Sequence, residues 1–97
     1  YVIHTVGPRY YLDGVDHAKL LADAYRNSMK VASDLGCKSI AFPSISTGVY
    51  GYPIAEAAEI AIRTVREEIS AGHELQEIVF CCFSQEDADC YKKLLAA

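Results

Sequence analysis

The sequence predicts an α/β protein built on a largely parallel sheet, and two features of the chain lead to this prediction. Stretches typical of β-strands alternate with longer stretches typical of amphipathic helices, which is the order found in parallel sheets. The apolar runs at residues 1–6, 38–42 and 77–83 are continuous rather than alternating, which indicates strands covered on both faces. Right-handed crossovers then bring the loops after all three strands to one edge of the sheet, where ligands of such folds bind.

The first strand–helix unit starts with a strand predicted at residues 1–6, so the chain begins inside an expected strand. A polar loop follows, up to Asp16. A helix is predicted from His17 to Leu35 because apolar residues recur three and four positions apart; they are Leu21, Ala24, Tyr25, Met29, Ala32 and Leu35. Gly36 is expected to end this helix in the left-handed conformation of a capping glycine.

The second unit joins the strand at residues 38–42 to a helix that begins at Pro53, because proline suits the first helical position. The helix is expected to end at Ala71 and Gly72. Its predicted buried stripe consists of apolar residues at helical spacing, namely Ile54, Ala58, Ala61, Ile62, Val65 and Ile69.

The third unit is a strand at residues 77–83 followed by a short helix. Ser84 is expected to cap this helix, with Asp87 as an acidic capping partner. Its predicted core positions are Ala88, Tyr91, Leu94 and Leu95.

Composition and charge narrow the range of functions. The 97 residues suffice for one domain. The net charge of −4 argues against nonspecific nucleic-acid binding, which needs a broad basic surface. No stretch is long and apolar enough for a membrane span, so no membrane association is expected. The four cysteines lack C-x-x-C spacing and are expected to be reduced, which predicts a cytoplasmic protein without a bound metal or cofactor.

The strongest functional signal is the segment from residue 42 to residue 53, FPSISTGVYGYP. A strand, a glycine-containing loop and a helix N-terminus follow one another, which is a geometry that binds anions through backbone N–H groups. Amides of Thr47 through Gly51 would face a diphosphate, with a hydroxyl from Ser46 or Thr47. The alternative interpretation is a tight turn that needs positive φ at Gly48 and Gly51.

Aromatic residues lie beside this loop. Tyr50 is expected to shape a sugar pocket, whereas Tyr52 is expected to pack against the following helix. Phe83 ends a strand at the same edge, where an exposed ring can stack on a purine, although an ordinary core position also explains it. His4, expected in mid-strand, is interpreted as a core imidazole rather than a catalyst.

Four segments occur in the order seen in macro domains, and the chain resembles that family over essentially its whole length. They are residues 2–8 (VIHTVGP), 24–28 (AYRNS), 39–43 (SIAFP) and 45–53 (ISTGVYGYP). The resemblance implies a three-layer α/β/α sandwich with a largely parallel mixed sheet. It also implies that ADP-ribose is the ligand, with Ser46, Thr47, Gly48, Val49, Tyr50 and Gly51 around its diphosphate and distal ribose and Phe83 against its adenine.

The segments that macro domains carry upstream of this region have no counterpart here. Gly14-Val15-Asp16 resembles the end of a catalytic glycine loop, but it follows the wrong strand and is interpreted as coincidence. Residues 1–97 are therefore expected to be the C-terminal part of a single macro domain whose N-terminal strands are missing. Catalytic residues are not assigned.

The resemblance implies that the intact protein hydrolyses an ester-linked ADP-ribose conjugate, either O-acetyl-ADP-ribose or a mono-ADP-ribosylated protein. This chain alone is expected to be inactive. One alternative is a noncatalytic module that reads ADP-ribose, and another is an unrelated α/β domain that binds a mononucleotide or phosphate. The unpaired strand edge and uncovered apolar face predict that the chain self-associates or pairs with its missing N-terminal part.

Overall fold

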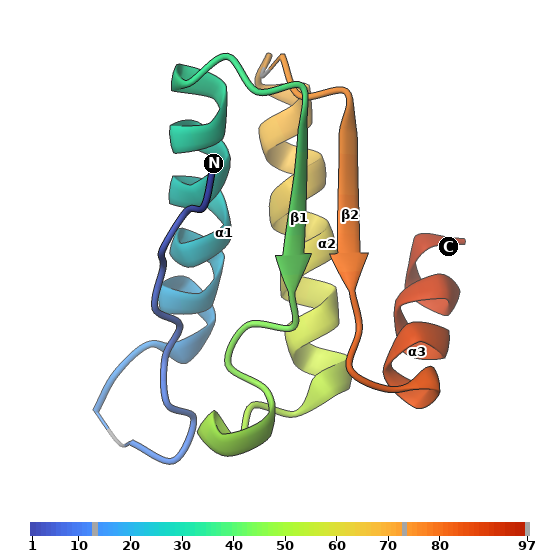
Figure 1. Cartoon of the computed structure of the whole chain (residues 1–97). Helices are drawn as coiled ribbons and strands as arrows, with labels where there is room; N and C mark the ends of the chain where they lie inside the picture. Colours follow the sequence, from blue (N-terminus) through green and yellow to red (C-terminus); the bar gives the residue numbers. More distant parts are fainter. Residues whose placement is uncertain (13, 73, 97) are drawn as a thin grey trace.

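A computed structural model describes residues 1–12, 14–72 and 74–96, and Figure 1 shows the arrangement of the elements. In chain order they are α1 (His17–Asp34), β1 (Ser39–Pro43), the single-turn 3-10 helix η1 (Gly48–Tyr50), α2 (Ile54–Ser70), β2 (Glu77–Cys81) and α3 (Gln85–Leu95). The predicted alternation of strands and helices is confirmed from α1 onward.

The sheet of the described residues consists of β1 and β2, which are parallel and in a register that pairs Ser39 with Glu77 and Pro43 with Cys81. Helix α2 makes the crossover between them. The strand predicted at residues 1–6 is wrong for this chain, because this segment forms no regular secondary structure and joins no ladder among the described residues. A strand is stable only when its backbone groups pair with a neighbour, and this segment has none.

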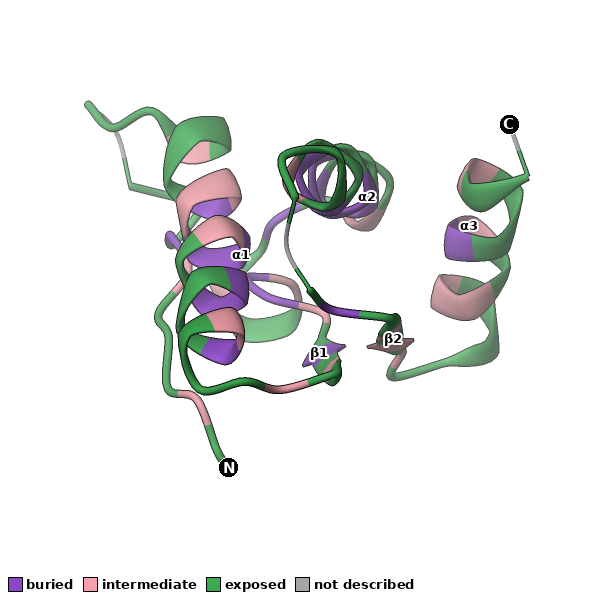
Figure 2. Ribbon diagram, turned by 90° about the horizontal axis from the view of Figure 1, so that it is seen from above, coloured by how far each residue is buried: buried purple, intermediate pink, exposed green. Residues whose placement is uncertain are grey.

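Helices cover only one face of the sheet. Figure 2 shows α1 and α2 above the two strands, with α3 beside α2 on the β2 side. On the opposite face, the residues that alternate with Phe42 along β1 and with Phe80 along β2 are exposed. Ala41 and Val79 are among them. The α/β class is confirmed, but the coverage of both strand faces predicted from the apolar runs is absent from the described residues.

The core lies between the helices and the covered face of the sheet. The predicted stripe of α1 is buried from Leu21 to Ala32, and that of α2 is buried from Ala58 to Val65. The last position of each predicted stripe, at Leu35, Ile69 and Leu95, is exposed instead, because each lies at the helix end beyond the elements that cover the core.

A row of aromatic rings crosses the core from α1 to α3. Tyr25 on α1 meets Phe42 on β1 with ring centroids 4.8 Å apart. Phe42 stacks on Phe80 at 6.3 Å, and Phe80 meets Tyr91 on α3 at 5.0 Å. Aromatic contacts at these separations add to the burial energy of each ring. The row therefore stabilises the packing of α1 on β1 and of α3 on β2.

Capping groups lie at both ends of α1 and at the start of α3, and those at Gly36 and Ser84 were predicted. The Asp16 carboxylate accepts a hydrogen bond from the Lys19 amide at 3.1 Å, and the Ser84 hydroxyl accepts one from the Asp87 amide at 3.2 Å. Gly36 has φ 77°, the left-handed conformation expected after α1. Pro53 was predicted at the first helical position of α2, but it lies one residue earlier, because α2 begins at Ile54. None of the helices in the described residues combines the length and apolar character that a membrane crossing requires.

Candidate functional site

The candidate site lies at the edge of the sheet where both strands end. Residues 44–53 lead from the carboxyl end of β1 to α2, and residues 82–84 lead from the same end of β2 to α3. Figure 1 shows that the turn after residues 1–6 reaches this edge as well. The predicted gathering of three loops is confirmed, and it is the position at which parallel sheets bind ligands.

The loop after β1 is a left-handed backbone turn closed by its own hydrogen bonds. Ser46, Gly48 and Gly51 have φ of 67°, 71° and 75°. The Gly51 amide donates to the Gly48 carbonyl and the Tyr52 amide donates to the Ser46 carbonyl, both at 2.9 Å. The tight turn that the glycines predict is therefore present, and it fixes the direction of the chain before α2 begins at Ile54.

Several amides of this turn remain available as donors. Within residues 1–12, 14–72 and 74–96, the amides of Ser46, Thr47, Gly48 and Val49 donate to no backbone carbonyl or side chain. No lysine or arginine lies between Lys38 and Arg63 to supply positive charge. Unpaired N–H groups next to a helix N-terminus form an anion-binding surface without a basic side chain.

Ser46 has the most unusual environment in the loop. Its residue is 7% exposed, and its hydroxyl has no hydrogen-bond partner in the described part of the chain. It also has a positive φ, which is rare for a residue other than glycine. A buried hydroxyl without a partner costs free energy. A ligand oxygen that accepted a hydrogen bond from Ser46 would remove that cost.

Two residues outside the loop hold it in place, and sequence reasoning missed both. Gly7 packs so closely against Ser46 Oγ and Ile45 Cγ2 that a Cβ at position 7 would overlap them. The Tyr10 amide donates to the Tyr50 carbonyl at 2.8 Å, and the Tyr10 ring lies 4.7 Å from the Tyr52 ring.

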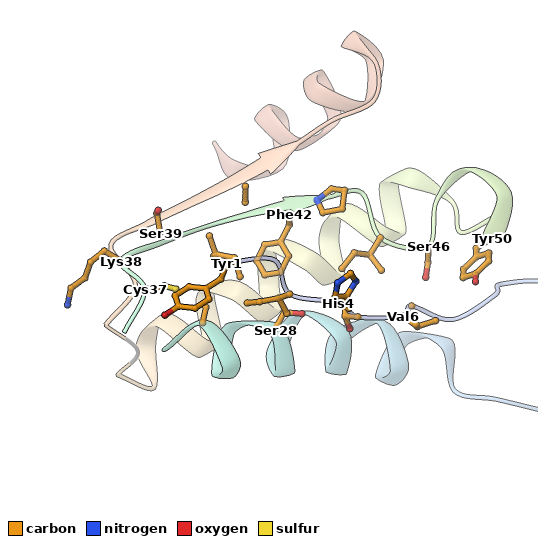
Figure 3. A pocket seen from close by; sticks show the side chains of 18 residues that line it. Tyr1, His4, Val6, Ser28, Cys37, Lys38, Ser39, Phe42, Ser46 and Tyr50 are labelled. Carbon is orange, nitrogen blue, oxygen red and sulfur yellow. The ribbon is translucent and has the colours of Figure 1, made fainter. Parts of the chain in front are cut away.

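A cavity of about 830 Å³ opens beside the loop. Figure 3 shows Ser46 and Tyr50 at one end of it and Cys37 and Lys38 at the other. The remaining predicted binding residues, Thr47, Gly48, Val49 and Gly51, do not line this cavity. Val49 is 91% exposed, so this part of the loop lies at the surface.

The aromatic predictions have different outcomes. Tyr52 is buried as expected, but its ring contact is with Tyr10. Phe83 is 97% exposed, so the core interpretation is wrong and the ring is free to stack on a ligand. The structure does not bring Phe83 into ring contact with any aromatic residue of the loop.

Two ionisable side chains near the site, Cys82 and His4, lie in different environments. Burial, followed by the nearby Asp87, raises the pKa of the Cys82 thiol, so this cysteine stays protonated at neutral pH. His4 is exposed instead of lying in a core strand, and it lines the cavity. No group of three or more metal-ligating side chains occurs in the part of the chain that the structure covers.

Burial also raises the pKa of Tyr25 well above its ordinary value, and that of Tyr91 as well. Both phenols therefore stay neutral. Tyr25 shares hydrogen bonds with Tyr91 and with the backbone of Ile45. This pair supports the first residues of the loop from the core side.

Comparison with known proteins gives the family. The family model described as "Macro domain" matches residues 1–61. The macro domain-containing protein CT2219 of Chlorobaculum tepidum is 54% identical over 97 residues, which are 100% of this chain and 56% of that protein. An O-acetyl-ADP-ribose deacetylase of Klebsiella pneumoniae is 51% identical over 96 residues, which cover 99% of this chain and 55% of the relative.

Solved structures give the same result. The Oceanobacillus iheyensis macrodomain with ADP superposes with a TM-score of 0.90 at 40% identity, over 96% of this chain and 48% of that one. The Trypanosoma brucei macrodomain in complex with ADP has a TM-score of 0.85 at 34% identity, over 95% of this chain and 38% of its own. The chain spans about half the length of the curated relatives that it matches. It belongs to the macro domain family.

Proposed function

We propose that the loop from Ser46 to Gly51 binds the diphosphate and distal ribose of ADP-ribose. The observation that carries the proposal is the set of unpaired amides from Ser46 to Val49, next to left-handed turns at Gly48 and Gly51. A diphosphate satisfies such donors with its oxygens, and the N-terminus of α2 adds favourable partial charge.

Three further observations support this ligand. The buried Ser46 hydroxyl lacks a partner, and it lines the cavity together with Tyr50. Phe83 is exposed at the same edge, where it would stack on the adenine. Similar macrodomains from Oceanobacillus iheyensis and Trypanosoma brucei have been solved with ADP and with ADP-ribose.

We extend the proposal to an intact protein with the span of the relatives, which would hydrolyse O-acetyl-ADP-ribose or a mono-ADP-ribosylated protein. Relatives named O-acetyl-ADP-ribose deacetylase, 51% identical to this chain, support this activity. In this role the loop would hold the conjugate so that a water molecule attacks the ester carbonyl. The amides would stabilise charge and fix the geometry, which is where most of the rate enhancement would arise.

A second candidate is a noncatalytic ADP-ribose reader. One observation favours it: residues 44–53 contain hydroxyls and amides but no carboxylate, imidazole or thiol that transfers a proton or attacks an ester. We therefore expect this chain by itself to bind without turning over. Turnover of O-acetyl-ADP-ribose by the isolated chain would contradict that expectation.

Calorimetry with ADP-ribose tests the binding proposal, and a glycine pair provides a matched control. Gly48→Glu places a carboxylate where the diphosphate would lie and is expected to abolish binding. Gly36 has nearly the same φ, 77° against 71°, and neither glycine has a neighbour within 4 Å of an added Cβ. Gly36→Glu therefore adds the same charge and comparable backbone strain at the opposite end of β1.

The expected result is measurable heat with the parent and with Gly36→Glu, and none with Gly48→Glu. If both variants lost binding equally, backbone strain or the added negative charge would explain the loss wherever the glutamate lies. That result would contradict a diphosphate site at the loop. Absence of heat from the parent at millimolar ADP-ribose would also contradict the proposal for this chain.

A further inference from the structure

A short segment outside the loop, residues 7–12, contacts the last residues of the loop through Tyr10. The Tyr10 amide donates to the Tyr50 carbonyl at 2.8 Å, and the centroids of the Tyr10 and Tyr52 rings lie 4.7 Å apart. Tyr10 does not line the cavity beside the loop. Figure 1 shows the turn that contains this segment next to η1. We call residues 7–12 the brace.

The brace is fixed on its other side by α1. The Leu12 amide donates to the Arg9 carbonyl at 3.2 Å, which closes the turn. His17, the first residue of α1, donates through Nε2 to the Leu12 carbonyl at 2.7 Å. The His17 ring also lies 5.1 Å from the Tyr10 ring. Tyr10 therefore stands between the start of α1 and the residues that precede α2.

The contact with Tyr50 fixes the orientation of a whole peptide group. The Tyr50 carbonyl and the Gly51 amide belong to one planar group. The brace binds the carbonyl of this group, and its amide donates to the Gly48 carbonyl at 2.9 Å. Because the group is held at both ends, a displacement of Tyr10 would be passed on to the Gly48 carbonyl.

Two of the unpaired donors of the loop belong to the peptide groups that accept these internal bonds. The Ser46 carbonyl accepts from the Tyr52 amide at 2.9 Å. In a trans peptide group the C=O and N–H bonds point in opposite directions, and no cis peptide bond occurs among the described residues. The Thr47 N–H, in the same group as the Ser46 carbonyl, therefore points away from Tyr52. The Gly48 carbonyl in the same way directs the Val49 N–H outward.

We propose that Tyr10 is a positioning residue for the loop, and that it aims the Thr47 and Val49 amides at a diphosphate through the backbone of residues 50–52. The proposal rests on the proposed binding of ADP-ribose and adds a residue outside the loop on which its affinity depends. Binding and the brace are then coupled. A ligand that prefers the aligned loop also stabilises the contacts that align it.

Calorimetry with ADP-ribose on three variants tests the role of the Tyr10 ring. Tyr10→Ala removes the ring contacts but keeps the amide, and it is expected to weaken binding about tenfold because the loop donors lose their alignment. Tyr10→Phe keeps the ring and is expected to bind as the parent does. Tyr11→Ala is the matched control, because the Tyr11 ring is 62% exposed and makes no ring contact within the described ranges.

Hydrogen exchange gives a measurement that a general loss of stability would not reproduce. In the parent, ADP-ribose is expected to slow exchange at the Tyr10 amide about fivefold or more, because coupling between two sites is reciprocal. The Leu12 amide, which donates to a carbonyl inside the brace, should change much less. Without ligand, Tyr10→Ala is expected to speed exchange at the Gly51 and Tyr52 amides, whereas Tyr11→Ala is not.

Three outcomes would overturn the positioning role while ADP-ribose binding stands. They are parent-like binding by Tyr10→Ala, equal weakening by Tyr10→Ala and Tyr11→Ala, and equal slowing of exchange at the Tyr10 and Leu12 amides when ADP-ribose binds the parent. The last measurement needs no variant, so it decides the matter even if Tyr10→Ala does not fold. No heat from the parent would instead overturn the proposed function on which this role rests.

Discussion

Gly7 and Ser46 are neighbours in space although 39 positions separate them, and each limits what the other position can hold. The close contact leaves no volume for a side chain at position 7. The Ser46 hydroxyl is buried, without a hydrogen-bond partner in the described residues. This pair sets the shape of the loop where it meets the cavity.

Gly7→Ala is expected to destabilise the protein by about 1–3 kcal/mol, the usual cost of overpacking. The added methyl group would overlap Ser46 Oγ and Ile45 Cγ2, neither of which is the end of a long flexible side chain. Chemical denaturation measures the change. Gly14→Ala is a useful comparison because that glycine has open space around it, so its cost comes from its positive φ alone. An unchanged denaturation midpoint for Gly7→Ala would contradict the packing argument.

Ser46→Ala separates stability from binding. Removing a buried hydroxyl that lacks a partner is expected to raise the free energy of unfolding, by up to about 1 kcal/mol. The same change is expected to weaken ADP-ribose binding, because the hydroxyl is a proposed contact. Denaturation and calorimetry on one variant give both values. Tighter binding, or a loss of stability above about 1 kcal/mol, would show that the hydroxyl already has a partner in the folded chain.

At the scale of elements, helices α1 and α2 are joined by a group of charges around Arg26. Its Nε donates to Glu68 Oε1 at 2.9 Å, and its Nη1 donates to Asp23 Oδ1 at 2.9 Å. Glu67 lies 3.9 Å from Nη2. One guanidinium therefore contacts carboxylates on both helices, Asp23 on α1 and Glu67 and Glu68 on α2, a geometry that lysine cannot reproduce.

Arg26→Ala is expected to lower the free energy of unfolding by about 1 kcal/mol, a modest value because the Arg26 side chain is 41% exposed and screened by solvent. Lys30→Ala is the control, since it breaks a single pair with Asp34 in which both side chains are mostly exposed. It is expected to cost less than Arg26→Ala, because solvent screens the exposed pair. Added salt should reduce the Arg26 effect. Equal costs for both variants would contradict the cross-helix role.

At the scale of the whole molecule, buried phenols make stability depend on alkaline pH. Burial raises the pKa of Tyr25 above its ordinary value of 10.0. Above pH 10 the unfolded chain loses this proton while the folded chain keeps it, so stability is full below pH 10 and falls above it. The expected fall is about 1.4 kcal/mol per pH unit for one such group.

Thermal melts between pH 8 and pH 11.5 measure this dependence. Tyr25→Phe is expected to be less stable at pH 8 and to show a shallower decline above pH 10. Tyr91, whose pKa burial also raises, would supply the part that remains. A decline of the same slope in Tyr25→Phe would place the alkaline transition elsewhere in the chain.

The sequence predicted the parts of the fold that depend on local chemistry. Helical spacing located the buried stripes of α1 and α2, and the capping residue Ser84 located the start of α3. The loop at residues 44–53 was located because strand, glycines and helix follow one another along the chain. These features are set by residues within a few positions of each other.

Features that depend on distant residues were not predicted. The segment at residues 1–6 has the composition of a strand. A strand also needs a neighbouring strand to pair with, and composition does not show whether one is present. The exposure of Phe83 was left open because an apolar residue at a strand end fits core and surface equally well. The contacts of Gly7 and Tyr10 with the loop join segments about 40 residues apart, and no local pattern indicates them.

The donors at Ser46 to Val49 are peptide groups, and this fact affects how the site can be regulated. A pocket built from lysine or arginine is silenced when an enzyme acetylates or methylates those side chains. Peptide amides are not modified in this way. Exchanging Thr47 or Val49 for another residue also leaves the amides in place, as long as the turn is kept. Regulation of this loop would have to act on its shape, through the segments that brace it from outside.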